Sequence, residues 1–214
     1  MSFIEFISKS YGDIIKSLLR HIELVGISIL LGIIISIPLG IFLTRHKRAA
    51  GPVLALAGTI QTIPGLVMLG FALILIGIGM LPAVTVLTLY AILPILRNTY
   101  TGITEVDKSY TEASRGIGMT NMQTLFRVEI PIALPTIITG IRLSTVYIVS
   151  WATLAGLIGA GGLGDLIWTG LSTYNTNYIL AGAIPSAIMA LVLNGLIGVL
   201  EKILTPRGLR GSRV

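Results

Sequence analysis

Four long stretches without a charged side chain are the feature that most constrains how this chain can fold. Residues 24–44, 49–96, 143–164 and 166–200 contain no Asp, Glu, Lys or Arg. Each is long enough to supply the roughly 20 apolar residues that a helix needs to cross a bilayer. Lipid offers no partner for backbone N–H and C=O groups, so such segments cross as helices. We therefore predict an all-α membrane protein.

Gly, Pro and charged residues divide these stretches into about five transmembrane helices. The stretch 49–96 is too long for one crossing, and its Gly and Pro residues at 77–82 indicate a tight reversal. The charged segment 101–131 separates the next two spans, and the Gly-rich segment 159–178 is predicted to be an external or re-entrant loop. The predicted spans are residues 24–43, 52–76, 83–100, 133–158 and 179–200.

The N-terminal segment 1–20 carries an apolar stripe on an otherwise charged sequence. The apolar residues recur at helical spacing from Ile4 to Leu18. This pattern predicts an amphipathic helix lying in the membrane interface before the first span. A frayed polar tail is the alternative. The predicted organisation is thus an N-terminal helix at 1–20, a permease domain at 21–204 and a tail at 205–214.

The basic residues predict the orientation of the chain. Lys and Arg gather at 45–48, in the 101–131 loop and in the tail, whereas the connections on the other side carry only Asp165. Cytoplasmic loops of membrane proteins are enriched in Lys and Arg. We therefore expect the C-terminus in the cytoplasm and the N-terminus outside. The net charge of +6 is explained by these loops and does not indicate nucleic-acid binding.

Several chemical functions lack the residues that they would need. The chain has no Cys and only two His, so we expect no metal site and no catalytic residue. No phosphate-binding loop of the G-x-x-x-x-G-K-[ST] type occurs, so ATP hydrolysis is not expected of this chain. Gly159, Gly161 and Gly164 match G-x-G-x-x-G, but they follow a membrane span rather than a strand. A segment that closes the pore or contacts a partner outside explains them better.

The loop 101–131 contains the most informative motif. It reads as a helix, a turn at Gly118 and a second helix that stops at Pro131 before the next span. Glu112 and Arg115 are three residues apart and therefore share one helix face. Gly118 permits a positive φ. An ordinary amphipathic surface loop is the alternative interpretation.

The spacing of this loop resembles the EAA loop of ABC importer permeases, which reads E-A-A, three residues, G, nine residues and I-x-L-P. Here Ser114 replaces the third-position Ala, while Val128 and Ile130 replace Ile and Leu. The resemblance implies a cytoplasmic coupling helix that docks on a separate ATPase subunit. The residues it assigns to ATPase coupling are Glu112, Ala113, Ser114, Arg115, Gly118 and Pro131.

Residues 61–65 (QTIPG), 93–102 (LPILRNTYTG) and 159–164 (GAGGLG) resemble the osmoprotectant branch of these permeases. The resemblance implies a pore-forming subunit, not an enzyme, of an importer for glycine betaine, carnitine or choline in the bacterial plasma membrane. It also implies as partners two cytoplasmic ATPase subunits, which bind ATP and Mg²⁺, a second permease and an extracytoplasmic substrate-binding protein, all in a lipid bilayer.

Polar residues inside the predicted spans are candidates for the translocation pathway, because polar side chains in lipid usually face a bundle or cavity. Pro64 is expected to break the second span near mid-membrane. Trp151 offers a cation–π surface for a quaternary ammonium. Packing between helices is the alternative for the small polar residues. The candidate pathway or gate residues are Gln61, Thr62, Pro64, Ser150 and Trp151.

Other kinds of transporter remain open on the residues alone. An ABC permease for another small solute, such as an amino acid, has the same pattern of hydrophobic spans and charged loops. An ion-gradient-driven carrier belongs to a different class and usually has ionisable residues at mid-membrane and inverted repeats. Here only Arg142 is charged within a predicted span, near its end, and no repeat is evident. A membrane enzyme is a weaker alternative.

Overall fold

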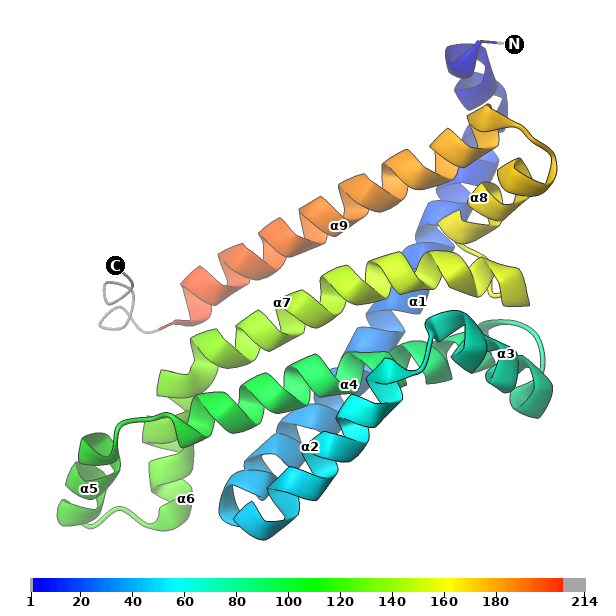
Figure 1. The fold of residues 1–214 in the computed structure, drawn as a ribbon. Coiled ribbons are helices and arrows are strands. Elements are labelled where there is room, and N and C mark those ends of the chain that lie inside the picture. The colour runs from blue at the N-terminus through cyan, green and yellow to red at the C-terminus, as the bar shows by residue number, and fades with distance from the viewer. Residues whose placement is uncertain (1, 206–214) are drawn as a thin grey trace.

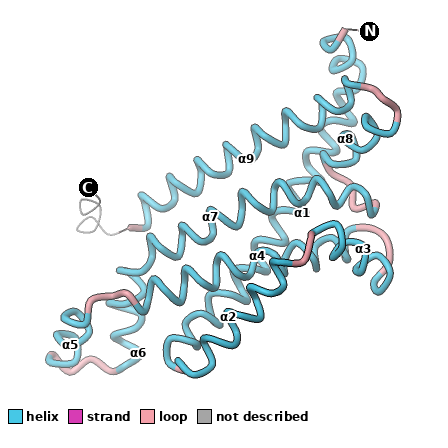
Figure 2. Tube along the Cα trace, in the orientation of Figure 1, coloured by secondary structure: helices cyan, strands magenta, loops and turns pink. Residues whose placement is uncertain are grey.

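The computed structural model describes residues 2–205, and every element in that part of the chain is a helix (Figures 1 and 2). Four helices are long and apolar enough to cross a membrane, and the bent pair α2–α3 is a fifth candidate. The predicted all-α class with about five spans is therefore confirmed.

The four long helices are α1 (Phe3–Arg45), α4 (Met80–Thr104), α7 (Ile130–Leu154) and α9 (Thr176–Leu204). The shorter helices are α2 (Lys47–Thr62), α3 (Gly65–Ile76), α5 (Lys108–Gly116), α6 (Asn121–Thr124) and α8 (Leu163–Ser172), with a π-helical turn at Leu125–Glu129 and a 3₁₀ turn at Ala155–Ile158.

Helix α4 forms the centre of the bundle. It packs against α1 and α7, and α9 lies along the other side of α7 (Figure 1). Small residues allow these helices to approach closely: Gly32 and Gly40 of α1 lie against Ala91 and Thr99 of α4. Such small-residue contacts are typical of helix packing in lipid, where the hydrophobic effect does not drive helices together. The outer surface of α9 is apolar and exposed, as expected of a helix that faces lipid or another subunit.

The segment 1–20, which we expected to be an interfacial helix before the first span, is helical from Phe3 onward and continues into that span without a break. Residues 3–45 are one continuous helix, α1, because no Gly or Pro interrupts the chain between the amphipathic part and the first span. The first part of the apolar stripe stays exposed, at Ile4, Ile7 and Tyr11, whereas Ile14 and Leu18 are partly buried. Phe6, on another face of α1, is 3% exposed, and its ring meets that of Tyr178 edge-on at a centroid distance of 4.7 Å.

The second span is broken where Pro64 predicted it. Helix α2 ends at Thr62, α3 begins at Gly65, and the two are bent by 92°. Pro64 has no N–H to donate and therefore cannot continue the hydrogen-bond ladder of α2. The segment predicted as one span at 52–76 is thus two short helices.

The segment 159–178 is not the loop that we predicted, because it contains helix α8. Gly159, Gly161 and Gly162 have φ values of 69°, 84° and 90° and turn the chain sharply after α7. Helix α8 then packs against α9 and α1. Its ten residues carry a single charged side chain, Asp165 in the first turn, which is too little to reveal a helical period, so the sequence pattern did not distinguish it from a loop.

Different segments of the chain gather at the two ends of the bundle. The C-terminal end of α1, the α5–α6 segment and the end of α9 lie toward one end, whereas the N-terminus, α3 and α8 lie toward the other (Figure 1). The two described basic segments, 45–48 and 101–131, therefore lie toward the same end. Of the predicted tail 205–214 only Thr205 is described, so the tail prediction lies outside the described residues. Among residues 2–205, no group of three or more His, Asp and Glu is placed to hold a metal ion.

Candidate functional site

Helix α5 and the turn after it are specified by local capping. Asp107 accepts a hydrogen bond from the Ser109 backbone N–H at 2.8 Å and so caps the start of α5. This bond lowers the pKa of the Asp107 carboxyl, which stays ionised. After α5, Gly118 has a φ of 83°, a conformation that other residues adopt only at a cost. The predicted glycine turn is therefore confirmed at Gly118.

A buried pair of hydroxyls ties α5 to α6. The Ser114 and Thr124 side-chain oxygens lie 2.9 Å apart, and the two residues are 3% and 4% exposed. Ser114 occupies the position where the EAA pattern has Ala. Its hydroxyl therefore makes a contact that Ala at this position does not offer.

Helix α5 has two faces of different chemistry. One face carries Lys108, Thr111, Glu112 and Arg115, which line a cavity of about 300 Å³ between α5 and the end of α1. Glu112 and Arg115 thus share a face, as their spacing predicted. Ala113 does not line this cavity and is exposed.

The opposite face of α5 is open and partly apolar. Tyr110 is 53% exposed and Ile117 is 75% exposed, and helical spacing places both on the side of Ala113. Apolar side chains in a polar loop indicate a contact surface for another protein.

An ion pair joins the end of α1 to the end of the loop. Arg45 bonds to Glu129 through two nitrogen–oxygen contacts, one of them Nη1 to Oε1 at 3.3 Å. The Glu129 side chain is 8% exposed and lies in the π-helical turn before Pro131, which occupies the first turn of α7. Sequence reasoning missed this pair, because the two residues are 84 positions apart.

The predicted pathway residues are partly brought together at the α2–α3 break. The Gln61 side-chain amide donates to the Tyr90 carbonyl at 3.1 Å, and the Tyr90 hydroxyl donates to the Ile63 carbonyl beside Pro64. The Tyr90 ring stacks on Trp151 of α7 at a centroid distance of 5.1 Å. Tyr90, which belongs to α4, therefore fixes the α2–α3 break in place beside α4 and α7. Nothing in its local sequence revealed this role.

Thr62 and Ser150 lie next to this arrangement in the chain but take no part in its hydrogen bonds. Both are exposed, and each hydroxyl bonds to a carbonyl of its own helix, at 2.7 Å to Thr59 and 3.3 Å to Val146. Neither contacts the stacked rings through a hydrogen bond. Within the single chain, they therefore mark an open surface rather than a closed site.

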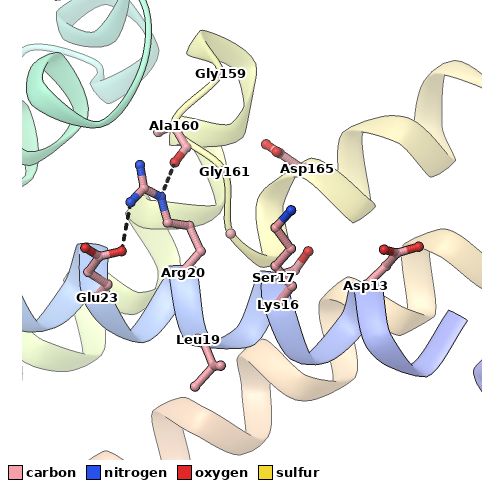
Figure 3. Close-up of a pocket in the computed structure, with 11 residues that line it drawn as sticks. Asp13, Lys16, Ser17, Leu19, Arg20, Glu23, Gly159, Ala160, Gly161 and Asp165 are labelled. Carbon is pink, nitrogen blue, oxygen red and sulfur yellow. Dashed lines mark hydrogen bonds and ion pairs between the residues drawn. The ribbon is translucent and has the colours of Figure 1, made fainter.

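The Gly-rich turn after α7 is anchored on α1, beside a cavity of about 770 Å³ (Figure 3). Arg20 donates from Nε to the Ala160 carbonyl at 3.1 Å and pairs with Glu23 at 2.8 Å. His21 is buried, and its Nδ1 accepts from the Leu163 N–H at 3.3 Å while Nε2 lies 3.1 Å from the Val149 carbonyl. A proton on Nε2 satisfies both bonds.

This turn does not have the setting of a dinucleotide site. A Gly-rich dinucleotide loop joins a strand to a helix, whereas these glycines join α7 and its 3₁₀ turn to α8. Asp165 at the start of α8 also lines the cavity, and burial raises the pKa of its carboxyl. The glycines serve close packing: a Cβ at Gly162 would lie 3.0 Å from His21 Nδ1.

Comparison with known proteins places this architecture. Residues 28–209 match the family described as the binding-protein-dependent transport system inner membrane component. The chain is 45% identical to the glycine betaine/carnitine/choline transport system permease protein OpuCB of Bacillus subtilis, with 97% of this chain and 96% of that protein covered. It is 42% identical to the osmoprotectant import permease protein OsmW of Salmonella typhimurium, with 98% and 100% covered.

A solved structure shares the fold. The inward-facing MetNI methionine ABC transporter superposes with a TM-score of 0.81 at 22% identity, covering 90% of this chain and 96% of that chain. Family membership implies a partner ATPase, which binds the ATP, and a partner binding protein. The chain belongs to the binding-protein-dependent transport system inner membrane component family, and it is the multi-pass permease subunit of an ABC importer rather than its ATPase.

Proposed function

We propose that this chain forms the translocation pathway for quaternary-ammonium osmoprotectants such as glycine betaine, carnitine and choline. The observation that carries the proposal is the similarity, over nearly the whole chain, to permeases named for these solutes. These include the choline transport system permease protein OpuBB of Bacillus subtilis, which is 44% identical over 97% of this chain. Quaternary ammonium groups bind favourably over aromatic rings, and Trp151 supplies such a ring beside the broken span.

The working unit in this proposal contains two permeases, two ATPase subunits and one binding protein. The Bacillus subtilis relatives include two permeases with the same system name, OpuCB and OpuCD, which are 45% and 40% identical to this chain. This supports pairing with a second, related permease. Thr62 and Ser150 are exposed in the single chain, as expected of residues on a pathway that a second permease completes.

Coupling in this proposal passes through α5. The exposed face around Ala113 docks on the ATPase, the Gly118 turn and the Ser114–Thr124 contact hold α5 against α6, and the π-helical turn leads to Pro131 and α7. Closure of the ATPases on ATP moves α5 as a unit, because these contacts fix its position. That motion then reaches α7, which carries Trp151.

The end of the bundle that contains α5 faces the cytoplasm in this proposal, and the N-terminus lies outside. The basic residues at 45–48 and the α5–α6 segment lie toward that end, which supports this orientation through the cytoplasmic preference of Lys and Arg. The Gly-rich turn and α8 then face the binding protein.

Uptake in cells that lack other osmoprotectant transporters tests the substrate. With the cognate ATPase and binding protein, we expect ATP-dependent accumulation of labelled choline or glycine betaine that excess unlabelled carnitine suppresses. Excess methionine is expected to leave it unchanged, because methionine has no quaternary ammonium group. Selective suppression by an amino acid would assign a different solute, and uptake that survives ATP depletion with an ion gradient intact would indicate a carrier.

A further inference from the structure

The cavity behind α5, on the side away from the exposed face around Ala113, gathers several basic side chains. Its volume is about 300 Å³, and its walls come from the ends of several elements. Arg45 comes from α1, Lys47 from α2, and Lys108 and Arg115 from α5. Four cations from three helices therefore surround one small space.

The charges in this cavity do not cancel. Arg45 is matched by Glu129, with which it forms the ion pair described above. Of the other charged residues in the wall, Glu112 is the single carboxylate, and it stands against Lys47, Lys108 and Arg115. No ion pair within 4.0 Å involves these three cations among the described residues. The cavity is therefore an electropositive site with donors that remain free for an anion.

The location of the cavity indicates what kind of anion reaches it. Thr44 and Arg45, at the end of the first span, line its wall. The same residues also line an adjoining hollow of about 530 Å³, which is formed by 44–49 and adds His46 and Arg48 to the basic surface. Basic pockets at the cytoplasmic ends of membrane helices are suited to anionic lipid head groups.

We propose that this cavity binds the phosphate group of an anionic phospholipid of the cytoplasmic leaflet. The phosphate accepts hydrogen bonds from Lys47 on α2 and from Lys108 and Arg115 on α5. It thereby links the coupling helix to the membrane surface from the side opposite its exposed face. The proposal rests on the proposed cytoplasmic orientation of this end, but it does not depend on which solute is transported.

Lipid retention by the purified transporter complex tests this proposal. The complex is exchanged into vesicles that contain equal amounts of phosphatidylglycerol and phosphatidylcholine, re-extracted and weighed by native mass spectrometry. We expect the unmodified complex to retain phosphatidylglycerol selectively. Each Lys near an anionic surface contributes about fivefold in affinity, so Lys47→Gln with Lys108→Gln is expected to lower the retention about 25-fold.

Two matched variants show whether the effect belongs to the cavity. Arg127→Gln removes one positive charge from the same loop at an exposed position that does not line the cavity, and it is expected to retain the lipid. Lys47→Arg with Lys108→Arg keeps the charge and is also expected to retain it. The proposal would be overturned if Arg127→Gln lost as much phosphatidylglycerol as the double Gln variant, or if the double Gln variant retained as much of it as the unmodified complex.

Inorganic phosphate distinguishes the lipid from a free anion. If the lipid is the ligand, phosphate at millimolar concentration leaves phosphatidylglycerol bound, because the acyl chains add apolar contacts that free phosphate lacks. Complete displacement by phosphate would contradict a lipid ligand and assign a free-anion site. The readout is lipid mass, so its failure is distinguishable from a failure of the uptake experiment.

Discussion

Ala113→Arg is expected to lower ATP-dependent uptake to less than about a tenth while leaving the permease folded in the membrane. Ala113 is exposed on the outer face of α5, beside Tyr110 and Ile117. A large charged side chain at the centre of a protein interface costs about 2 kcal/mol or more, which weakens binding about thirtyfold. The measurement is co-purification of the ATPase subunit together with uptake of labelled choline.

Tyr174→Arg is the control for this prediction. Tyr174 is 96% exposed and lies between α8 and α9, toward the end of the bundle away from α5. Arg at this position is expected to leave ATPase co-purification unchanged. Normal ATPase association in Ala113→Arg would mean that α5 is not the docking helix.

Gly65→Ala is expected to disrupt the α2–α3 break and to abolish most uptake. A Cβ at Gly65 would overlap the six-membered ring of Trp151, which is itself stacked on Tyr90. Overpacking of this kind costs about 1–3 kcal/mol, and here the strain falls on the hinge between two short helices. The thermal stability of the purified protein and its uptake rate are the measurements.

Two comparisons make this prediction specific. Gly70→Ala changes another glycine of α3, where an added Cβ meets nothing within 4 Å, and it is expected to retain activity. Trp151→Ala added to Gly65→Ala removes the overlap and is expected to recover the stability lost by Gly65→Ala, although the loss of the ring limits the gain. Full activity in Gly65→Ala alone would show that the Gly65–Trp151 contact does not matter for transport.

Features that depend on local sequence were predictable. The charge-free stretches indicated the spans, because lipid imposes the same requirement on every residue of a crossing helix. Pro64 predicted a break because its effect on the helix needs no partner. The turn at Gly118 and the shared face of Glu112 and Arg115 followed from backbone freedom and helical spacing in the same way.

Features that depend on contacts between distant segments were not predictable from the pattern. The role of Tyr90 arises only when α4 meets the α2–α3 break, and the Arg45–Glu129 pair forms only when α1 meets the start of α7. The amphipathic start of α1 was recognised as helical from its spacing, but the pattern did not reveal that Phe6 packs against Tyr178. That contact forms only when α1 meets α9, which is far away in the sequence.

Single introduced cysteines test most directly whether the ATPase subunit docks on α5 of this permease. The chain has no native Cys, so Ala113→Cys and Ser172→Cys each introduce one exposed thiol, toward opposite ends of the bundle. A short cross-linker that joins a thiol to an amine, applied to membranes that contain the whole transporter, is expected to join the thiol of Ala113→Cys to lysines of the ATPase subunit and to leave that of Ser172→Cys unjoined to it. Cross-linking of the ATPase through position 172, or none through position 113, would contradict coupling through α5.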